Sequence, residues 1–402
     1  MAGLLPVEDA LALLLAGAGP LQGDAVPIAE AAGRVLAAPV AALRTQPPFD
    51  ASAMDGYAVR AEDIAALPAF LAVTGESAAG SRFAGTVGPG EAVRIFTGAP
   101  VPEGADTILL QEDARPAGAR RIEATESTER GRHIRRAGRD FREGEALLPA
   151  GRVLDPAALS LAAAANHAAV PVVRRPLVAV LATGSELVAP GREPGPDQIV
   201  ASNSYGIAAI AGSCGAEVLD LGIVPDDRAA MTAAVGRALA AGADVIVTLG
   251  GASVGDHDLV RPVLEAMGMD LDFWKIAMRP GKPLMLGRLG AARVLGLPGN
   301  PVSSLVCAHL FLKPLVSALA GFGWSDPARD AVLATAMNAN GERQDYVRAK
   351  LGREAGQLTA TPFRTQDSSM LRTLAEADAL IIRPPNAPAA KAGDPCRVLP
   401  LR

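Results

Sequence analysis

The chain has 402 residues, of which 50% are hydrophobic, 20% are charged and only 3% are aromatic, and its formal net charge is -5. This length allows roughly two to four domains, and the composition excludes a disordered chain and a protein that binds polyanions through bulk charge. The scarcity of aromatic residues argues against a stacking surface for single-stranded nucleic acid.

Cysteine usage and apolar runs indicate the compartment. Cys214, Cys307 and Cys396 are far apart and have no zinc-ligand spacing, which is typical of a reducing compartment. No apolar run reaches the roughly 18 to 20 residues that a membrane span needs. The N-terminal "LALLLAGAG" resembles the core of a secretion signal, but Glu8 and Asp9 precede it and no basic residue does. We therefore expect a cytoplasmic protein.

The first half of the chain changes character twice. Residues 1–45 are expected to be helical up to a Pro-rich joint at "TQPPFD". Residues 46–141 contain β-like runs ("AFLAVTG", "EAVRIFTG", "DTILLQED") between Gly and Pro turns, which predicts a small β domain. Residues 142–174 return to a helical pattern with an Asp-Pro start in "DPAALSLAAAANHAA". We therefore predict that this β domain is inserted into a helical or linker domain formed by both flanks.

The second half alternates strands and helices. A strand over 177–182 is followed by a helix near "SNSYGIAAIAGSC", a strand "AEVLDLGIV", a helix "DDRAAMTAAVGRALAAG" and a strand "DVIVTLG". Apolar strands alternating with helices predict a parallel sheet covered on both faces, and hence a doubly wound α/β domain over 175–324. Residues 325–402 are β-rich and punctuated by Pro, which predicts a C-terminal β domain. The fold class is thus multidomain α/β plus β.

Ligands of doubly wound sheets bind at the carboxyl ends of strands, where this chain has acidic loops. The loop in "TLGGASVGDHD" contains Gly250, Gly251, Ser253, Asp256 and Asp258. The glycines leave room for a ligand, the serine can hydrogen-bond it, and the aspartates can bind a hard cation. Asp226 in "IVPDDRAA" and Glu186 in "ATGSELV" follow two other strands. The alternative for Asp226 and Asp258 is a helix N-cap.

Basic and Pro-rich segments complete this edge of the sheet. The run "WKIAMRPGKP" carries Lys275, Arg279 and Lys282 around a Pro-Gly turn, where they can hold an oxyanion such as phosphate or molybdate. Solvated surface charge is the alternative. The segment "LPGNPVSS" is predicted to contain the end of a strand followed by the start of a helix. The N–H groups at the N-terminus of this helix can hold an anion. The alternative is a rigid, Pro-capped helix start without a ligand. The residues of interest in this segment are Pro298, Asn300 and Pro301.

Three segments of the predicted β domain also carry polar residues in turns. In "SAMDGYAVR", Asp55 lies either in an Asp-Gly hairpin or in a ligand loop. The segment "FTGAPVPEGADTILLQED" puts Thr97 in a turn between strands, and "HIRRAGRD" offers Arg135 and Asp140. Because acids are adjacent and the net charge is negative, a solvated or ligand-facing loop explains these arginines better than a nucleic-acid surface does.

Taken in order, "SAMDGYAVR", "FTGAPVPEGADT", "IRRAGRD", "ATGSEL", "GGASVGDHD", "FWKIAMRPGKP" and "LPGNPVSS" resemble the molybdopterin molybdenumtransferases (MoeA), relatives of the C-terminal part of gephyrin. The resemblance spans about residues 5–400. It implies insertion of molybdate into the dithiolene of adenylylated molybdopterin, with release of AMP and assistance from a divalent cation, usually Mg²⁺. It also implies a homodimer of four-domain protomers, with the site between the α/β domain of one chain and the β domain of the other.

The resemblance also implies site residues. The predicted catalytic residues are Asp55, Thr97, Asp140, Glu186, Asp226 and Asp258. The predicted substrate-binding residues are Arg135, Gly250, Gly251, Ser253, Lys275, Arg279, Lys282, Pro298, Asn300 and Pro301. The predicted Mg²⁺ ligands are Asp226, Asp256 and Asp258. Two positions depart from the family pattern: Arg279 stands where some members have lysine, and Ala252 replaces a common valine.

Two other functions remain open. The α/β domain also resembles that of molybdopterin adenylyltransferases, but the β domain with "MDGYA" argues against that activity. A non-enzymatic scaffold like gephyrin would need an added partner-binding module or a long linker, and the sequence shows neither. We expect adenylylated molybdopterin and molybdate as ligands and other molybdenum cofactor biosynthesis proteins as partners. We expect neither nucleic acid nor membrane as a partner.

Overall fold

The chain forms two compact units. The computed structural model describes residues 4–251, 259–273 and 275–402. One unit comprises Met1–Asp24 with Val172–Arg402, and the other is the continuous stretch Ala25–Pro171. The second unit is therefore an insertion in the chain of the first. The chain passes between the units through β1 (Gly23–Pro27) and β12 (Ala169–Val173), which pair with each other.

The α/β domain contains a six-stranded sheet in which parallel strands form the centre. In spatial order the strands are β16 (Glu217–Val224), β13 (Leu177–Thr183), β17 (Val245–Leu249), β21 (Ala292–Leu297), β20 (Met285–Leu289) and β18 (Asp270–Phe273). The first four strands are parallel to one another. Strand β20 pairs antiparallel with β21, and β18 pairs antiparallel with β20. The predicted doubly wound α/β domain is confirmed, with an antiparallel edge. A small parallel pair, β14 (Leu187–Val188) and β15 (Ile199–Val200), follows β13.

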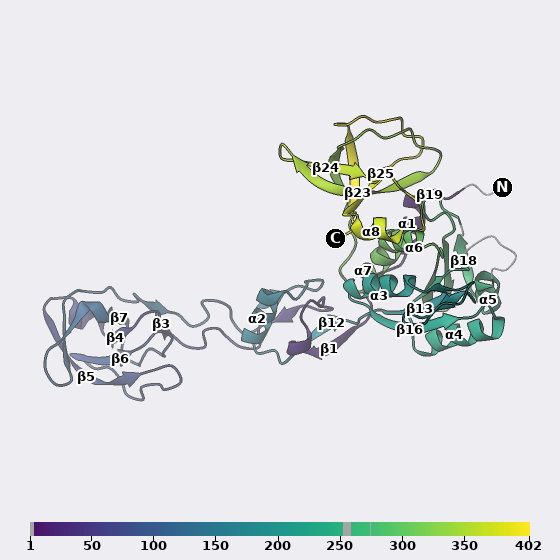
Figure 1. Cartoon of the computed structure of the whole chain (residues 1–402). Helices are drawn as coiled ribbons and strands as arrows, with labels where there is room; N and C mark the ends of the chain where they lie inside the picture. The colour runs from purple at the N-terminus through teal and green to yellow at the C-terminus, as the bar shows by residue number, and fades with distance from the viewer. Residues whose placement is uncertain (1–3, 252–258, 274) are drawn as a thin grey trace. The chain divides into compact units, whose positions relative to one another are not determined.

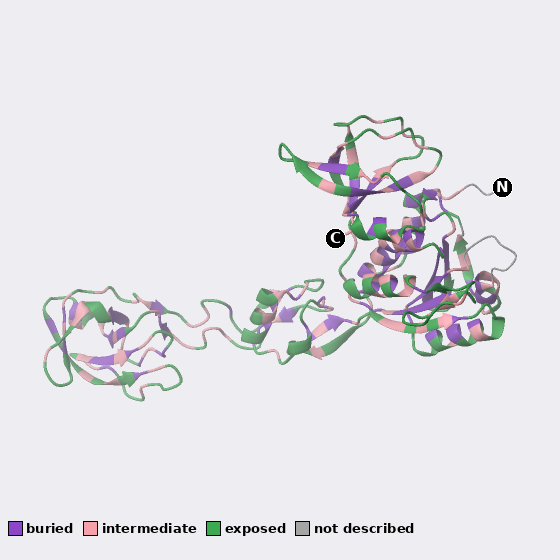
Figure 2. Ribbon diagram, in the orientation of Figure 1, coloured by how far each residue is buried: buried purple, intermediate pink, exposed green. Residues whose placement is uncertain are grey.

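Helices cover both faces of this sheet (Figure 1), since the strands are apolar on both sides. Val245 and Val247 of β17 belong to a core shared with α3 (Asn203–Ser213), α6 (Pro301–Cys307) and α7 (Lys313–Leu319). Ile246 belongs to a second core with α4 (Arg228–Ala240) and α5 (Val260–Ala266). Figure 2 shows buried and exposed positions alternating along α4, as expected for a helix with one face on a sheet.

The helix from Pro301 to Leu319 is long and apolar. It joins α6, a π-helical turn (Ala308–Leu312) and α7, and its mean hydropathy over an 18-residue window is 1.6. Among the described residues it alone is long and apolar enough for a membrane span, contrary to the expectation of no such run. Because 67% of the window is buried inside the protein, its apolar composition is explained by its place in the core.

The C-terminal β domain closes on itself. Its strands are β22 (Arg329–Leu333), β23 (Gln344–Glu354), β24 (Gln357–Pro362), β25 (Ala379–Arg383) and β26 (Pro395–Pro400), with α8 (Leu371–Glu376) before β25. The long β23 pairs with both β24 and β25, which makes the sheet barrel-like. The short β19 (Met278–Arg279), which follows β18 in the chain, pairs in parallel with β23. The basic turn of the sequence is therefore attached to this domain.

The inserted unit contains the predicted β domain. Its sheet has the order β7 (Thr107–Leu110), β4 (Gly56–Val59), β6 (Glu91–Ile95), β5 (Ala69–Ser77), β9 (Arg121–Ala124) and β8 (Ala114–Pro116). The three β-like runs noted in the sequence are β5, β6 and β7. The short β3 (Ala51–Ser52) pairs with β10 (Ile134–Arg135), outside that sheet.

The flanks are less helical than expected. In residues 1–45 the only α-helix among the described residues is α1 (Val7–Leu15), and β1 and β2 (Val40–Ala41) follow it. Frequent Gly and Pro after Leu15 interrupt helical hydrogen bonding. Between residues 142 and 174, α2 (Pro156–Ala164) lies between β11 (Ala146–Leu148) and β12. The predicted Asp-Pro start of α2 is confirmed, since the Asp155 side chain accepts a hydrogen bond from the Ala158 N–H.

Candidate functional site

Asp55 and Thr97 are joined in the β domain. They lie beside two neighbouring strands, Asp55 before β4 and Thr97 after β6. The backbone N–H and the hydroxyl of Thr97 donate to Asp55 Oδ1 at 2.7 and 2.8 Å. The backbone hydrogen bond first, and then the hydroxyl hydrogen bond, lower the pKa of Asp55 below its ordinary value. The hairpin interpretation is wrong, because β3 pairs with β10 whereas β4 pairs with β6 and β7.

Arg135 and Asp140 line a cavity of about 500 Å³ in the same domain. The other lining residues are Gln46, Pro47, Pro48, Phe49, Ala51, Gly98 and Arg139. Strand β3 brings the two loops together, since Ala51 pairs with Arg135 and the Ser52 carbonyl accepts from the Gly98 N–H at 2.8 Å. Gly98 follows Thr97, so the four site residues predicted in this domain lie on loops that meet at β3.

Glu186 and Asp226 follow neighbouring strands, β13 and β16, at the carboxyl edge of the α/β sheet. Asp226 is bound to the loop after β13: its Oδ2 accepts from the Ser185 N–H at 3.1 Å, and its own N–H donates to Ser185 Oγ at 3.2 Å. The helix cap is the next residue, Asp227, whose side chain accepts from the Ala230 N–H at 2.8 Å. The capping alternative for Asp226 is therefore wrong.

Gly250, at the end of β17, lies close to β13 and β21. Its φ is +90°, and a Cβ there would lie 2.9 Å from the Thr183 carbonyl oxygen. Its N–H donates to the Leu297 carbonyl at 3.1 Å. A glycine is thus required by the packing of the strand ends, independently of any ligand. Gly251 also has a positive φ, of +62°. The predicted Ser253, Asp256 and Asp258 lie outside the described residues.

The basic turn is fixed on both sides. Arg279 forms an ion pair with Asp345 of β23, whose side chain is 8% exposed against 59% for that of Arg279. Gly281, with a φ of +104°, packs so closely that a Cβ would lie 2.4 Å from Cys307 Sγ. Arg279 and Lys282 line a cavity of about 370 Å³ together with Leu4, Asn340, Gly341, Glu342, Arg343 and Asp345. Lys275 is exposed in the turn, where its carbonyl accepts from the Leu5 N–H at 3.1 Å.

The segment Pro298–Pro301 connects β21 to α6, with Pro301 in the first turn of the helix and Asn300 at its N-cap position. Asn300 Nδ2 donates to Ser368 Oγ at 3.1 Å, and the Val302 N–H donates to the Ser368 carbonyl at 3.1 Å. A segment of the C-terminal domain therefore occupies part of this helix start. Ser368, Arg343 and Asp345 were missed in the sequence, because residues 325–402 offered only a β pattern.

The donor chemistry at the sheet edge suits a hard cation, since Mg²⁺ prefers carboxylate oxygens. Asp226 and Glu186 supply such oxygens from adjacent loops. Across the part of the chain that the structure describes, no group of three or more His, Cys, Asp or Glu side chains is placed to hold a metal. Asp226 and Glu186 could thus provide two ligands, and the other predicted ligands, Asp256 and Asp258, lie in the stretch that is not described.

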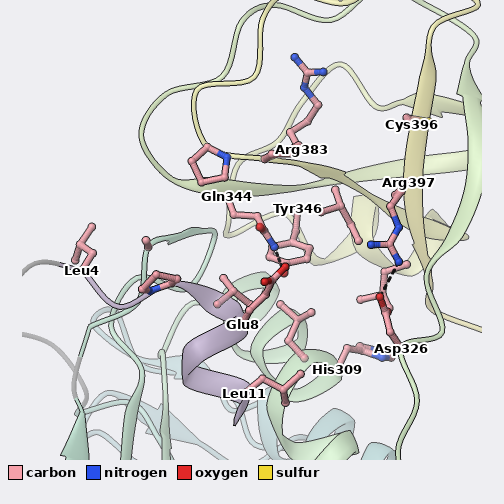
Figure 3. A pocket seen from close by; sticks show the side chains of 18 of the residues that line it. Leu4, Glu8, Leu11, His309, Asp326, Gln344, Tyr346, Arg383, Cys396 and Arg397 are labelled. Carbon is pink, nitrogen blue, oxygen red and sulfur yellow. Dashed lines mark hydrogen bonds and ion pairs between the residues drawn. The ribbon is translucent and has the colours of Figure 1, made fainter. Parts of the chain in front are cut away.

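Figure 3 shows a further cavity, and two of its lining residues, Leu4 and Glu342, also line the cavity of Arg279 and Lys282. This further cavity has a volume of about 890 Å³ and is lined by α1, the π-helical turn and the C-terminal domain. Within it, Gln344 Nε2 donates to the Tyr346 hydroxyl at 2.5 Å. Burial, and then the nearby Lys313 charge, lower the pKa of His309 to about 4. None of the predicted site residues that the structure describes lines this cavity.

The three parts of the chain match known sequence families in order. Residues 5–166 match the MoeA N-terminal region (domain I and II), residues 179–318 a probable molybdopterin binding domain, and residues 330–401 the MoeA C-terminal region (domain IV). The fold and its acidic sheet edge thus define a multidomain protein built around a domain of the molybdopterin-binding type.

Relatives that match over most of their length identify the family within this class of proteins. A protein of Mycobacterium tuberculosis named molybdopterin molybdenumtransferase 2 is 38% identical over 93% of this chain and 94% of its own length. A molybdopterin molybdenumtransferase of Haemophilus influenzae is 36% identical over 90% of both chains. A crystal structure of the molybdopterin biosynthesis MoeA protein of Pyrococcus horikosii superposes with a TM-score of 0.86 at 30% identity and full coverage of both chains. The chain belongs to the molybdopterin molybdenumtransferase (MoeA) family.

Proposed function

We propose that this chain inserts molybdate into adenylylated molybdopterin and releases AMP, as a transferase of molybdenum cofactor biosynthesis. Its family membership supports this reaction. The observation that carries the proposal is the arrangement of Asp226 and Asp227. Asp227 caps α4, whereas Asp226 is hydrogen-bonded to Ser185 in the loop after β13. The Asp226 carboxylate therefore lies at the edge of the sheet where ligands of such folds bind.

The basic turn supplies the proposed oxyanion site. Lys282 and Arg279 line one cavity, and charge-assisted hydrogen bonds from such groups are stronger than neutral ones. Because Asp345 already offsets much of the Arg279 charge, Lys282 carries more of the attraction for molybdate. The work of these residues is positioning and electrostatic stabilisation, which needs no protein nucleophile.

We expect Mg²⁺ to assist, with Asp226 as one ligand and Asp256 and Asp258 as the other candidates from the sequence. A bound divalent cation would neutralise phosphate charge and stabilise the leaving phosphate oxygen. The chain's own part is to orient the Asp226 carboxylate, which the Ser185 N–H does through its 3.1 Å hydrogen bond to Oδ2.

We further propose that the chain acts as a cytoplasmic homodimer, alongside other proteins of cofactor biosynthesis. The predicted residues are divided between the two units: Asp55, Thr97, Arg135 and Asp140 lie in Ala25–Pro171, and the others lie in the unit that comprises Met1–Asp24 and Val172–Arg402. In a two-fold dimer each copy can complete the site of the other. The β domain of one copy would then face the α/β domain of its partner.

Reconstitution tests the reaction. The purified chain is incubated with adenylylated molybdopterin, molybdate and MgCl₂, while AMP release and activation of an apo-molybdoenzyme are followed. We expect both signals to depend on molybdate and on the chain. Pyrophosphate release from molybdopterin and ATP would indicate an adenylyltransferase instead. A chain that is inactive in both assays would support the scaffold alternative.

A further inference from the structure

The segment from Arg135 to Asp140 carries two predicted site residues but little regular structure, since β10 ends at Arg135. Asp50 holds this segment. Its Oδ1 accepts from the Ala137 N–H at 2.8 Å, and its Oδ2 forms an ion pair with Arg136 Nη1 at 2.5 Å. The two oxygens of one carboxylate thus fix both the backbone and a side chain at the centre of the segment.

Two backbone hydrogen bonds attach the second half of the same segment to residues that precede Asp50 in the chain. The Gly138 N–H donates to the Pro47 carbonyl at 3.0 Å, and the Asp140 N–H donates to the Gln46 carbonyl at 3.1 Å. Gly138 has a φ of +71°, a conformation that L side chains rarely adopt. The turn that separates Arg135 from Asp140 is therefore held against residues 46–50 along its whole length.

These contacts decide which side chains line the cavity of the β domain. Arg135, Arg139 and Asp140 line it, whereas Asp50 and Arg136 do not. Arg136, which is paired with Asp50, does not line the cavity. Arg135 and Arg139, which come before and after it in the chain, do line the cavity. The lining residues include two arginines, one carboxylate (Asp140) and Phe49, and this excess of positive charge beside an aromatic ring favours an anionic ligand with a planar group.

We propose that Asp50 is a positioning residue for the reaction: it holds the 135–140 segment so that Arg135 and Arg139 together bind the phosphate-bearing part of the substrate. This rests on the proposed function for the identity of the substrate. It adds Arg139 as a binding residue, which was not among the site residues predicted from the sequence. Asp50 itself acts only through the segment that it anchors.

The β domain offers a matched control in Asp106. Its Oδ1 accepts from the Ala61 N–H at 2.8 Å, and its Oδ2 pairs with Arg130 Nε at 3.0 Å. The two carboxylates are similarly exposed, at 35% for Asp50 and 27% for Asp106, and Asp106 does not line the cavity. Asp50→Asn and Asp106→Asn each keep an acceptor oxygen and remove one ion pair, so their effects on stability should be alike.

The kinetic test compares these variants for molybdenum insertion. Asp50→Asn should raise the KM for adenylylated molybdopterin about tenfold, because small misplacements of binding groups reduce productive binding. Arg136→Ala should reproduce this effect, since it removes the same ion pair from the other side. Asp106→Asn should stay within about twofold of the parent chain. Equal KM values for Asp50→Asn and Asp106→Asn would overturn the proposal, as would a tenfold change in KM that Arg139→Ala fails to share.

Amide hydrogen exchange measures how firmly Asp50 holds this segment, and the measurement does not depend on enzymatic activity. In Asp50→Asn, the amides of Gly138 and Asp140 should exchange faster than in the parent chain, while those of Asp106→Asn should not change there. Unchanged exchange in Asp50→Asn would overturn the anchoring. If the parent chain inserts no molybdenum, the proposed function fails, and the exchange result alone then decides whether Asp50 holds the segment.

Discussion

Thr97 donates two hydrogen bonds to one oxygen of Asp55, from its backbone N–H at 2.7 Å and from its hydroxyl at 2.8 Å. Both bonds favour the ionised carboxylate and lower the pKa of Asp55. Only Oδ1 is used, and Oδ2 accepts no hydrogen bond from a described residue. Thr97 therefore orients the carboxylate and keeps it charged while one of its oxygens stays available to a ligand.

The substitution Thr97→Val should disturb the orientation of the Asp55 carboxylate while affecting the stability of the fold only slightly. The substitution keeps the backbone hydrogen bond and the branched shape but removes the hydroxyl, so the pKa of Asp55 should rise towards its ordinary value. We expect a loss of about 1 kcal/mol or less in the free energy of unfolding and about a tenfold loss in kcat/KM. Carboxyl NMR titration and molybdenum insertion kinetics measure the two effects. An unchanged rate, with Asp55→Asn strongly impaired, would show that the hydroxyl has no catalytic importance.

Asp226→Asn and Asp227→Ala should have opposite effects on activity and stability. Asp227 caps α4, and Asn is also a good N-cap, so Asp227→Ala is the informative variant and should cost about 1 kcal/mol of stability. Asp226→Asn should leave thermal unfolding nearly unchanged and reduce AMP release by at least about 100-fold, because it removes a proposed metal-binding charge. Full AMP release by a folded Asp226→Asn variant would contradict the role of this carboxylate.

Arg279 and Lys282, two of the three cations of the basic turn, should not contribute equally to molybdate binding. Arg279 is paired with Asp345, while Lys282 forms no ion pair with any residue in the described ranges. We expect Lys282→Ala to raise the molybdate concentration for half-maximal insertion about tenfold, and Arg279→Ala to raise it less. Titrations at low and high salt, with Lys313→Ala as a control cation, measure this difference. A larger effect of Arg279→Ala would reverse the assignment.

His309 should make stability depend on pH. Its pKa is lowered from 6.5 to about 4, first by burial and then by Lys313. Between these values the unfolded chain binds more protons than the folded chain, so stability falls as the pH falls through this window. At pH 5 the cost is about 2 kcal/mol.

His309→Gln removes this titration. The difference in Tm between pH 7 and pH 5 should therefore shrink, as measured by calorimetry at both pH values. His133→Gln, in the other unit, serves as the control. A Tm difference as large in His309→Gln as in the parent chain would show that other groups cause the acid sensitivity.

Mixed dimers test whether two chains share each site. Asp55→Ala and Asp226→Ala chains should each be inactive, but a mixed dimer would have one doubly altered site and one intact site. With random assembly half of the dimers are mixed, so about a quarter of all sites should recover after co-refolding. Molybdenum insertion by the mixture, with mixed dimers verified by differential tags, measures the recovery. No recovery would mean that each site is built within one chain.

Local patterns in the sequence were sufficient for much of this protein. Buried strands such as β17 are continuously apolar, and helix starts such as Asp155 before Pro156 carry their own capping groups. A window of a few residues is therefore enough to predict either element. The family resemblance likewise named Asp55, Thr97 and Asp226 before any contact was known. The helical flanks were mispredicted because apolar residues there also suit short strands once Gly and Pro interrupt the helix.

The partners of the site residues were decided by the tertiary structure alone. Ser185 is 41 residues from Asp226, Arg279 is 66 from Asp345, and Asp50 is 87 from Ala137. No periodicity extends over such separations, since these pairs meet only when strand order and register bring distant loops together. Which aspartate caps α4, which arginine is neutralised and which carboxylate anchors a loop therefore depend on the folded chain. The sequence determined the residue types that can bind an anion or a cation, and the fold determined which of them are free to do so.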